Sequence, residues 1–144
     1  MTYRSLAIFA IVLGCSSESI PADAATRQSA GKQYSIQAEL ASPTPTAGEN
    51  IELLITITPE APYVLKSTTP MKIALECTEG CELTQSKLTA KDIKDEETEA
   101  KSVATVLTAR SGKHRLDGDL SFFLCTDEIC ERKTDDLILS FEAL

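Results

Sequence analysis

Residues 51–58, with the sequence IELLITIT, decide the fold of this chain. Large aliphatic residues occupy every odd position of the stretch, mostly polar residues occupy the even positions, and Pro59 follows. A repeat of two residues is typical of a β-strand with one buried face, because successive side chains of a strand point to opposite sides. The sequence therefore predicts a strand over 51–58.

The rest of the chain contains more short runs of this kind and no amphipathic helix. The runs are rich in β-branched or aromatic residues and cover Tyr34–Leu40, Met71–Glu76, Ser102–Ala109, Asp119–Cys125 and Leu137–Ala143. Turn residues between the runs predict turns at 42–48, 59–62, Gly80, 111–112 and 117–118. This spacing predicts an all-β domain, an immunoglobulin-like antiparallel β-sandwich of about 7 strands.

The stretch 90–101, AKDIKDEETEAK, is the one segment that is compatible with a helix. Its single large apolar residue is Ile93, so no apolar stripe is available to dock on a sheet. We expect an exposed crossover loop or one exposed turn of helix here.

The first residues resemble an export signal. Arg4 precedes an apolar run over 6–13, and Gly14 and Cys15 follow directly. The run is far shorter than the ~20 residues that span a bilayer, so the sequence predicts a lipoprotein signal peptide over 1–14 with lipid attached to Cys15. An ordinary cleavage site after Ala24 and a free Cys15 thiol are the alternatives. Lipidation is favoured because the Gly14-Cys15 junction follows the apolar run immediately.

The predicted organisation is a signal peptide (1–14), a lipidated flexible tether (15–33) and a β-sandwich domain (34–144). The tether is rich in Ser and Ala and has no apolar periodicity. We expect an exported protein, lipid-anchored in the bacterial envelope and facing the periplasm. Ser16 after the lipidated cysteine favours the outer membrane. The lipid would be the only contact with the membrane.

The chain is acidic, with 22 Asp and Glu against 14 Lys and Arg and a net charge of −8. This charge argues against nucleic acid as a partner. His114 is the only histidine and no Trp is present, so His-based metal sites and nucleophile–histidine catalysis lack their parts. Gly-rich phosphate loops are also absent. We expect no cofactor, and the cysteines are the remaining candidates for reactive residues.

Cys125 and Cys130 enclose four residues between two predicted strands, as at the end of a hairpin. Residues that face each other there lie within the distance that a disulfide needs. Cys77 and Cys81 enclose a tighter loop, in which Gly80 supplies a permissive backbone. Two local disulfides are therefore possible. A purely structural role for both, and a zinc site made by all four cysteines, remain alternatives.

Residues 120–133, LSFFLCTDEICERK, resemble the cysteine hairpin of the amino-terminal periplasmic domain of the thiol:disulfide interchange protein DsbD. The segments 57–63 and 70–75 are also similar to that family, and the likeness spans roughly 34–143. The family's domain is an immunoglobulin-like sandwich. The family's reductase carries a transmembrane domain and a thioredoxin-like domain that these 144 residues lack, and the pair Cys77/Cys81 departs from the family pattern.

The resemblance implies an electron-transfer role in the periplasm. A partner would reduce the cysteine pair, which would then reduce disulfides of other envelope proteins. Cys130 would form the mixed disulfide and Cys125 would resolve it. The expected partner is a periplasmic thiol-disulfide exchange protein or another envelope protein. The alternative function is a non-enzymatic lipoprotein that binds a partner and has two structural disulfides.

Nearby charges have opposing effects on a thiolate at this hairpin. Asp127, Glu128 and Glu131 disfavour it, whereas Arg132 and Lys133 favour it. We therefore expect no strongly acidic thiol, which suits a reductant that receives electrons from a partner better than a strong oxidant.

Overall fold

The structure is a computed structural model that describes residues 29–30 and 33–144. The predicted signal peptide, Cys15 and the alternative cleavage site lie outside the described residues. Nine strands and one turn of 3-10 helix make up this part of the chain. They are β1 (Ser29–Ala30), β2 (Tyr34–Leu40), β3 (Ile51–Pro59), β4 (Lys72–Cys77), β5 (Cys81–Leu83), β6 (Lys87–Thr89), η1 (Ala90–Asp92), β7 (Lys101–Ala109), β8 (Gly112–Cys125) and β9 (Cys130–Ala143). The short β1 falls within the stretch predicted as a tether.

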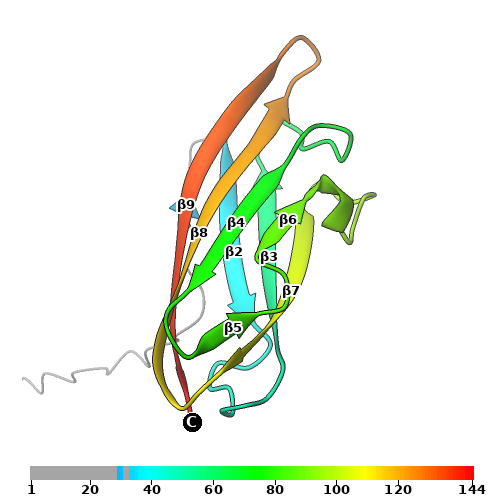
Figure 1. Ribbon diagram of the computed structural model, residues 1–144. Coiled ribbons are helices and arrows are strands. Elements are labelled where there is room, and N and C mark those ends of the chain that lie inside the picture. Colours follow the sequence, from blue (N-terminus) through cyan, green and yellow to red (C-terminus); the bar gives the residue numbers. More distant parts are fainter. Residues whose placement is uncertain (1–28, 31–32) are drawn as a thin grey trace, which may run out of the picture.

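The strands form two sheets that pack face to face (Figure 1). The five-stranded sheet has the order β1-β2-β3-β7-β5, and the four-stranded sheet has the order β6-β4-β8-β9. All the pairings within the two sheets are antiparallel. The predicted immunoglobulin-like antiparallel β-sandwich is confirmed. Within the described residues, no helix is long and apolar enough to cross a bilayer.

The core lies between the sheets and comes from alternate residues of the strands. In β3 the aliphatic residues at odd positions are all at most 4% exposed, as the period-two pattern predicts. The largest fully buried side chain is Phe122 of β8. Leu65 and Met71, on either side of the loop before β4, also enter this core. Burying one large apolar side chain contributes about 1.5–3 kcal/mol of stabilising free energy, so the core between the sheets holds them together.

The turn predicted at 117–118 is wrong, because both residues lie inside the 14-residue strand β8. Gly118 pairs with Leu75 of β4 on one side and Leu137 of β9 on the other. A Cβ at Gly118 would lie 3.0 Å from Cδ2 of Leu75 and 3.3 Å from Cβ of Leu137. The glycine therefore permits close side-chain packing in the middle of a sheet.

The segment 90–101, between β6 and β7, matches the predicted exposed loop only in part. Most of the segment is exposed and contains the turn η1, but Ile93 is buried in the core. Lys101 at the start of β7 is only 6% exposed. Its ammonium group donates hydrogen bonds to the backbone carbonyls of Asp95, Glu96 and Thr98. A buried lysine thus anchors the acidic loop to the sandwich.

A polar contact joins the two sheets beside β9. The hydroxyl of Tyr34 in β2 donates a hydrogen bond of 3.0 Å to Oδ2 of Asp135 in β9, and the Tyr34 ring packs edge-on against Phe122 at 5.0 Å. Burial first, and then the hydrogen bond and charge of Asp135, raise the pKa of Tyr34 from 10.0 to about 12.

This shift predicts an alkaline weak point of the fold. A pKa that is raised in the folded state gives stability that is complete below pH 10 and is lost as the pH rises through about 12. The difference in unfolding free energy between the wild type and Tyr34→Phe should therefore shrink between pH 10 and pH 12. Urea unfolding at a series of pH values measures it. A difference that stays constant over that range would contradict the role of the hydroxyl.

Candidate redox site at the tip of the β8–β9 hairpin

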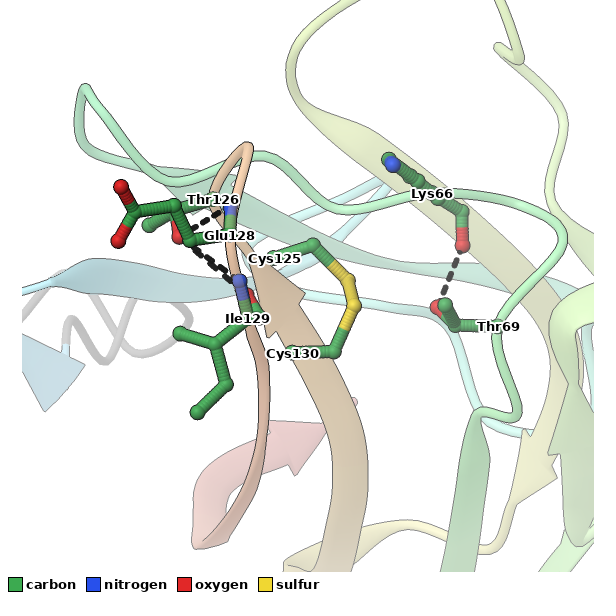
Figure 2. Close-up of a disulfide and its surroundings, with 7 residues drawn as sticks. All are labelled: Lys66, Thr69, Cys125, Thr126, Glu128, Ile129 and Cys130. Atoms are coloured by element: carbon green, nitrogen blue, oxygen red, sulfur yellow. Dashed lines mark hydrogen bonds between the residues drawn. A yellow bond between two sulfur atoms is a disulfide. The ribbon is translucent and has the colours of Figure 1, made fainter.

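Cys125 ends β8 and Cys130 begins β9, so the two cysteines close the hairpin where its strands stop. Thr126 shapes the four-residue turn between them. Its N–H donates to the carbonyl of Ile129 at 2.8 Å, and its hydroxyl accepts from the N–H groups of Glu128 and Ile129 (Figure 2). The predicted hairpin is confirmed, although β9 begins seven residues before the predicted strand at Leu137. Glu131 to Asp136 are polar, and the sequence pattern did not indicate a strand there.

Cys125 and Cys130 face each other directly and form a disulfide with a Cα–Cα distance of 4.0 Å. The N–H and the C=O of Cys125 bond to Val64, at 2.9 and 2.8 Å, on the side away from β9. The two cysteines are therefore a non-hydrogen-bonded pair, which is the closer of the two kinds of antiparallel pair. The strand register thus holds both sulfur atoms within bonding reach, and forming or breaking the bond leaves the backbone ladder in place.

The two cysteines differ in their access to solvent. Cys125 is fully buried at 0% exposure, whereas Cys130 is exposed. By alternation along β8, Cys125 belongs to the outer face of the sheet with the half-buried residues Ser121 and Phe123. The backbone bridge from Val64 places the loop after β3 next to Cys125. A reagent in solution therefore meets Cys130 first.

Two exposed apolar residues adjoin the cysteines, and the side chain of Ile129 points away from the disulfide (Figure 2). Val64 is 41% exposed next to Cys125, and Ile129 is 59% exposed next to Cys130. Leu144 is the other large apolar side chain that is exposed in the described part of the chain. Sequence reasoning missed Val64, because nothing in the local sequence indicates that this loop pairs with β8.

The charges at the tip partly cancel. Lys133 forms an ion pair with Glu131 at 3.0 Å, and Arg132 donates from Nε to the hydroxyl of Ser121 at 3.1 Å. Asp127 and Glu128 project from the exposed turn. The two cations predicted to favour a thiolate thus bond to Glu131 and Ser121, and the turn itself is acidic. The expectation of no strongly acidic thiol stays a prediction.

Cys77 and Cys81 also form a disulfide, with a Cα–Cα distance of 5.6 Å. Cys77 ends β4 in one sheet and Cys81 begins β5 in the other, so this bond spans the crossover of the chain between the sheets. Gly80 between them has a φ of +86°, the left-handed conformation for which a glycine was expected. Cys81 is buried in the core, which gives this pair the position of a structural staple.

The two disulfides lie at opposite ends of the sandwich. Cys77 pairs with Leu116 near the start of β8, whereas Cys125 ends that strand. At ~3.3 Å per residue this is roughly 30 Å along β8. A zinc site made by all four cysteines is therefore incompatible with the fold. Within residues 33–144 no cluster of His, Cys, Asp and Glu side chains is arranged to hold a metal ion.

His114 lies at the end with the second disulfide. Its Nε2 lies 2.7 Å from the carbonyl oxygen of Arg110, and its ring packs against Phe141 at 5.5 Å. A Cβ on Gly80 would lie 3.4 Å from its Cε1. Because Cys125 is at the other end of β8, His114 cannot act as a base for it.

Comparisons with known proteins add a fold-level likeness only. No family model and no curated protein sequence matches the chain. The GAE domain of GGA2p from Saccharomyces cerevisiae is similar in structure, with a TM-score of 0.44, 11% identity, and coverage of 80% of this chain and 97% of that chain. The GAE domain of yeast GGA1 has a TM-score of 0.32, 16% identity, and coverage of 76% and 94% respectively. The resemblance to the DsbD domain stays a prediction.

Proposed function

We propose that this chain is an envelope lipoprotein that takes part in thiol-disulfide exchange through Cys125 and Cys130. The observation that carries the proposal is the unequal exposure of a disulfide at a hairpin tip, with Cys130 open to solvent and Cys125 buried. Exchange needs one sulfur atom that a partner can approach and a second one within reach to resolve the intermediate. The resemblance to the DsbD domain gives the same two roles.

In the reduced protein, the Cys130 thiolate attacks a sulfur atom of the partner's disulfide. This forms a mixed disulfide and releases one partner thiolate. The Cys125 thiolate then attacks Sγ of Cys130, which closes the intramolecular disulfide and releases the second partner thiolate. Two electrons pass from the cysteine pair to the partner, and the two protons of the cysteine thiols go to solvent and then to the released thiolates. A reduced donor regenerates the dithiol by the reverse sequence.

The surroundings of Cys130 support a protein partner. Val64, in the connection between β3 and β4, is bridged to Cys125 and exposes apolar surface, and Ile129 in the hairpin turn exposes more. We therefore infer that a periplasmic exchange protein, or another envelope protein, docks over the hairpin tip.

Anchoring and localisation are part of the proposal. The apolar run before Cys15 supports a lipid-anchored protein that faces the periplasm, and Ser16 favours the outer membrane. An oxidising compartment is also where both disulfides would persist. The lipid on Cys15 would keep the hairpin tip close to membrane-bound partners.

The second candidate function is a non-enzymatic binding lipoprotein with two structural disulfides. The position of Cys77 and Cys81 at the crossover between the sheets favours it for that pair. The same role for Cys125 and Cys130 would make both bonds resistant to reduction.

The reduction potential of each pair separates the two functions. We expect the pair Cys125/Cys130 to have a potential above about −270 mV, in the range of redox carriers, and the pair Cys77/Cys81 to stay oxidised below about −300 mV. Equilibration in graded glutathione buffers, followed by alkylation and counting of alkylated thiols in each peptide by mass, measures both potentials in one sample. The second pair is the internal control. If Cys125/Cys130 also stays oxidised below about −300 mV, the exchange function is wrong.

A further inference from the structure

Strand β9 forms an open edge of the four-stranded sheet. It pairs with β8 along all of its 14 residues, and no described strand pairs with its other side (Figure 1). An edge strand presents a row of unpaired N–H and C=O groups, which another strand can extend. The long β9 is therefore a place where the sheet can grow.

The register shows which residues of β9 direct their amides outward. Cys125 and Cys130 form a non-hydrogen-bonded pair, and the pairing of β8 with β9 continues without a bulge to Gly112 and Ala143. Because the two kinds of pair alternate, every even-numbered residue of β9 points its N–H and C=O away from β8. The N–H of Asp136 agrees, since it bonds outward to Oδ1 of Asp135 at 2.8 Å.

Charges along this edge have a symmetric pattern. The sequence Arg132-Lys133-Thr134-Asp135-Asp136 has two cations, a neutral residue and two anions. In an antiparallel pairing with an identical strand, centred on Thr134, each cation lies opposite an anion. Opposite charges that face each other across strands are stabilising, and like charges are destabilising.

We propose that two copies of this chain associate by pairing β9 with β9, antiparallel and centred on Thr134. The outward N–H of Thr134 would donate to the C=O of Thr134 in the second copy, and its C=O would accept from the N–H of that residue. Arg132 would form the same pair of bonds with Asp136 of the second copy. Arg132 and Asp136 are both exposed on the outer face, and Arg132 bonds only to Ser121 among the described residues. In the dimer, the N–H of Asp136 would donate to the backbone carbonyl of Arg132 in the second copy instead of to Oδ1 of Asp135. The product is one continuous eight-stranded sheet.

Neighbouring registers are disfavoured by charge. Centring the pairing on Arg132 or on Asp136 places each of these residues opposite itself. Centring it on Lys133 places two Lys133 side chains together, and centring it on Asp135 does the same for two carboxylates. The register around Thr134 is the one of these five in which all facing charges are opposite.

The expected association is reversible, because a single pair of strands buries less surface than the 1,200–2,000 Å² of a typical stable interface. Sedimentation velocity of the purified chain, from about 1 µM to about 1 mM, measures it. The wild type should show a dimer fraction that rises with concentration and falls with added salt, since exposed ion pairs are screened. A wild type that stays monomeric at about 1 mM overturns the proposal.

Charge exchange tests the register. Arg132→Asp and Asp136→Arg, each alone, convert two attractive pairs into two repulsive pairs and should raise the dimer dissociation constant about tenfold or more. The double variant should restore the wild-type value, and a mixture of the two single variants should form heterodimers in preference to either homodimer. If the wild type dimerises but the single variants dimerise equally well, another surface pairs and the proposal is wrong.

A backbone substitution gives an independent test. Thr134→Pro removes an outward N–H and leaves the bonds to β8 intact, in the manner that proline is tolerated on edge strands. This variant should lose the dimer and keep the far-ultraviolet circular dichroism spectrum of the wild type. A folded Thr134→Pro protein with an unchanged dissociation constant overturns the proposal, and the charge variants decide the matter if this variant fails to fold.

Discussion

Replacing Phe122 by alanine is expected to lower the free energy of unfolding by about 3–5 kcal/mol, the cost of removing a large aromatic side chain from a closed core. Phe122 is fully buried between the two sheets, and Tyr34 packs edge-on against its ring at 5.0 Å. The cavity would therefore weaken both the core and the contact that joins β2 to β9. Because domains of this size have a total stability of about 5–15 kcal/mol, the loss would be a large share of it.

The neighbouring residue supplies the control. Phe123 has the same side chain but points to the outer face of the sheet, where it is only partly buried. Phe123→Ala should therefore cost less than half as much as Phe122→Ala. Urea denaturation of both variants with the disulfides intact measures the difference. Equal losses would mean that the inward and outward faces of β8 have been assigned wrongly.

The sandwich itself could be predicted from the sequence because its signal is repeated and local. In β2 and β3 the aliphatic residues mostly alternate with polar ones, β7 is a run rich in β-branched residues, and the observed bounds of all three agree with the predicted runs to within about one residue. The short strands β5 and β6 were missed. Each has three residues, which is too few for a period-two pattern to stand out.

Long-range packing explains the remaining errors. Asp117 and Gly118 have the composition of a turn, yet Gly118 lies inside β8, where Leu75 and Leu137 come close to it from the two neighbouring strands. Residues 131–136 are polar because they form the exposed half of an edge strand, so that no apolar alternation identifies them. In both places a residue's role depends on strands that are distant in sequence.

In the candidate site, too, the local features could be predicted and the features set by distant residues could not. The local pairing of Cys125 with Cys130 could be predicted, because a four-residue loop between strands brings its ends together. Their unequal exposure could not be predicted, because it depends on the backbone bonds from Val64, which lies about 60 residues earlier. The proposed attacking and resolving roles of the two cysteines rest on that inequality.

Cys125→Ser and Cys130→Ser are therefore expected to behave very differently, although each leaves one thiol of the same pair. The first leaves the exposed Cys130 thiol, and the second leaves the buried Cys125 thiol. Thiol exchange depends on access as well as on the thiolate fraction. The thiol of the Cys125→Ser variant should react with Ellman's reagent roughly a hundredfold faster than that of the Cys130→Ser variant. Both variants should also carry Cys15→Ser, so that no other free thiol reacts with the reagent.

The same two variants test the proposed roles of the two cysteines in exchange. Incubated with a disulfide-bonded peptide, Cys125→Ser should accumulate a stable mixed disulfide at Cys130, because the resolving thiol is missing. Cys130→Ser should accumulate almost none, because the peptide cannot reach Cys125 beneath the backbone bridge to Val64. Peptide mass analysis shows which cysteine is modified and whether Cys77 and Cys81 remain joined. Equal trapping by the two variants would contradict both the assigned roles and the idea that burial directs the partner to Cys130.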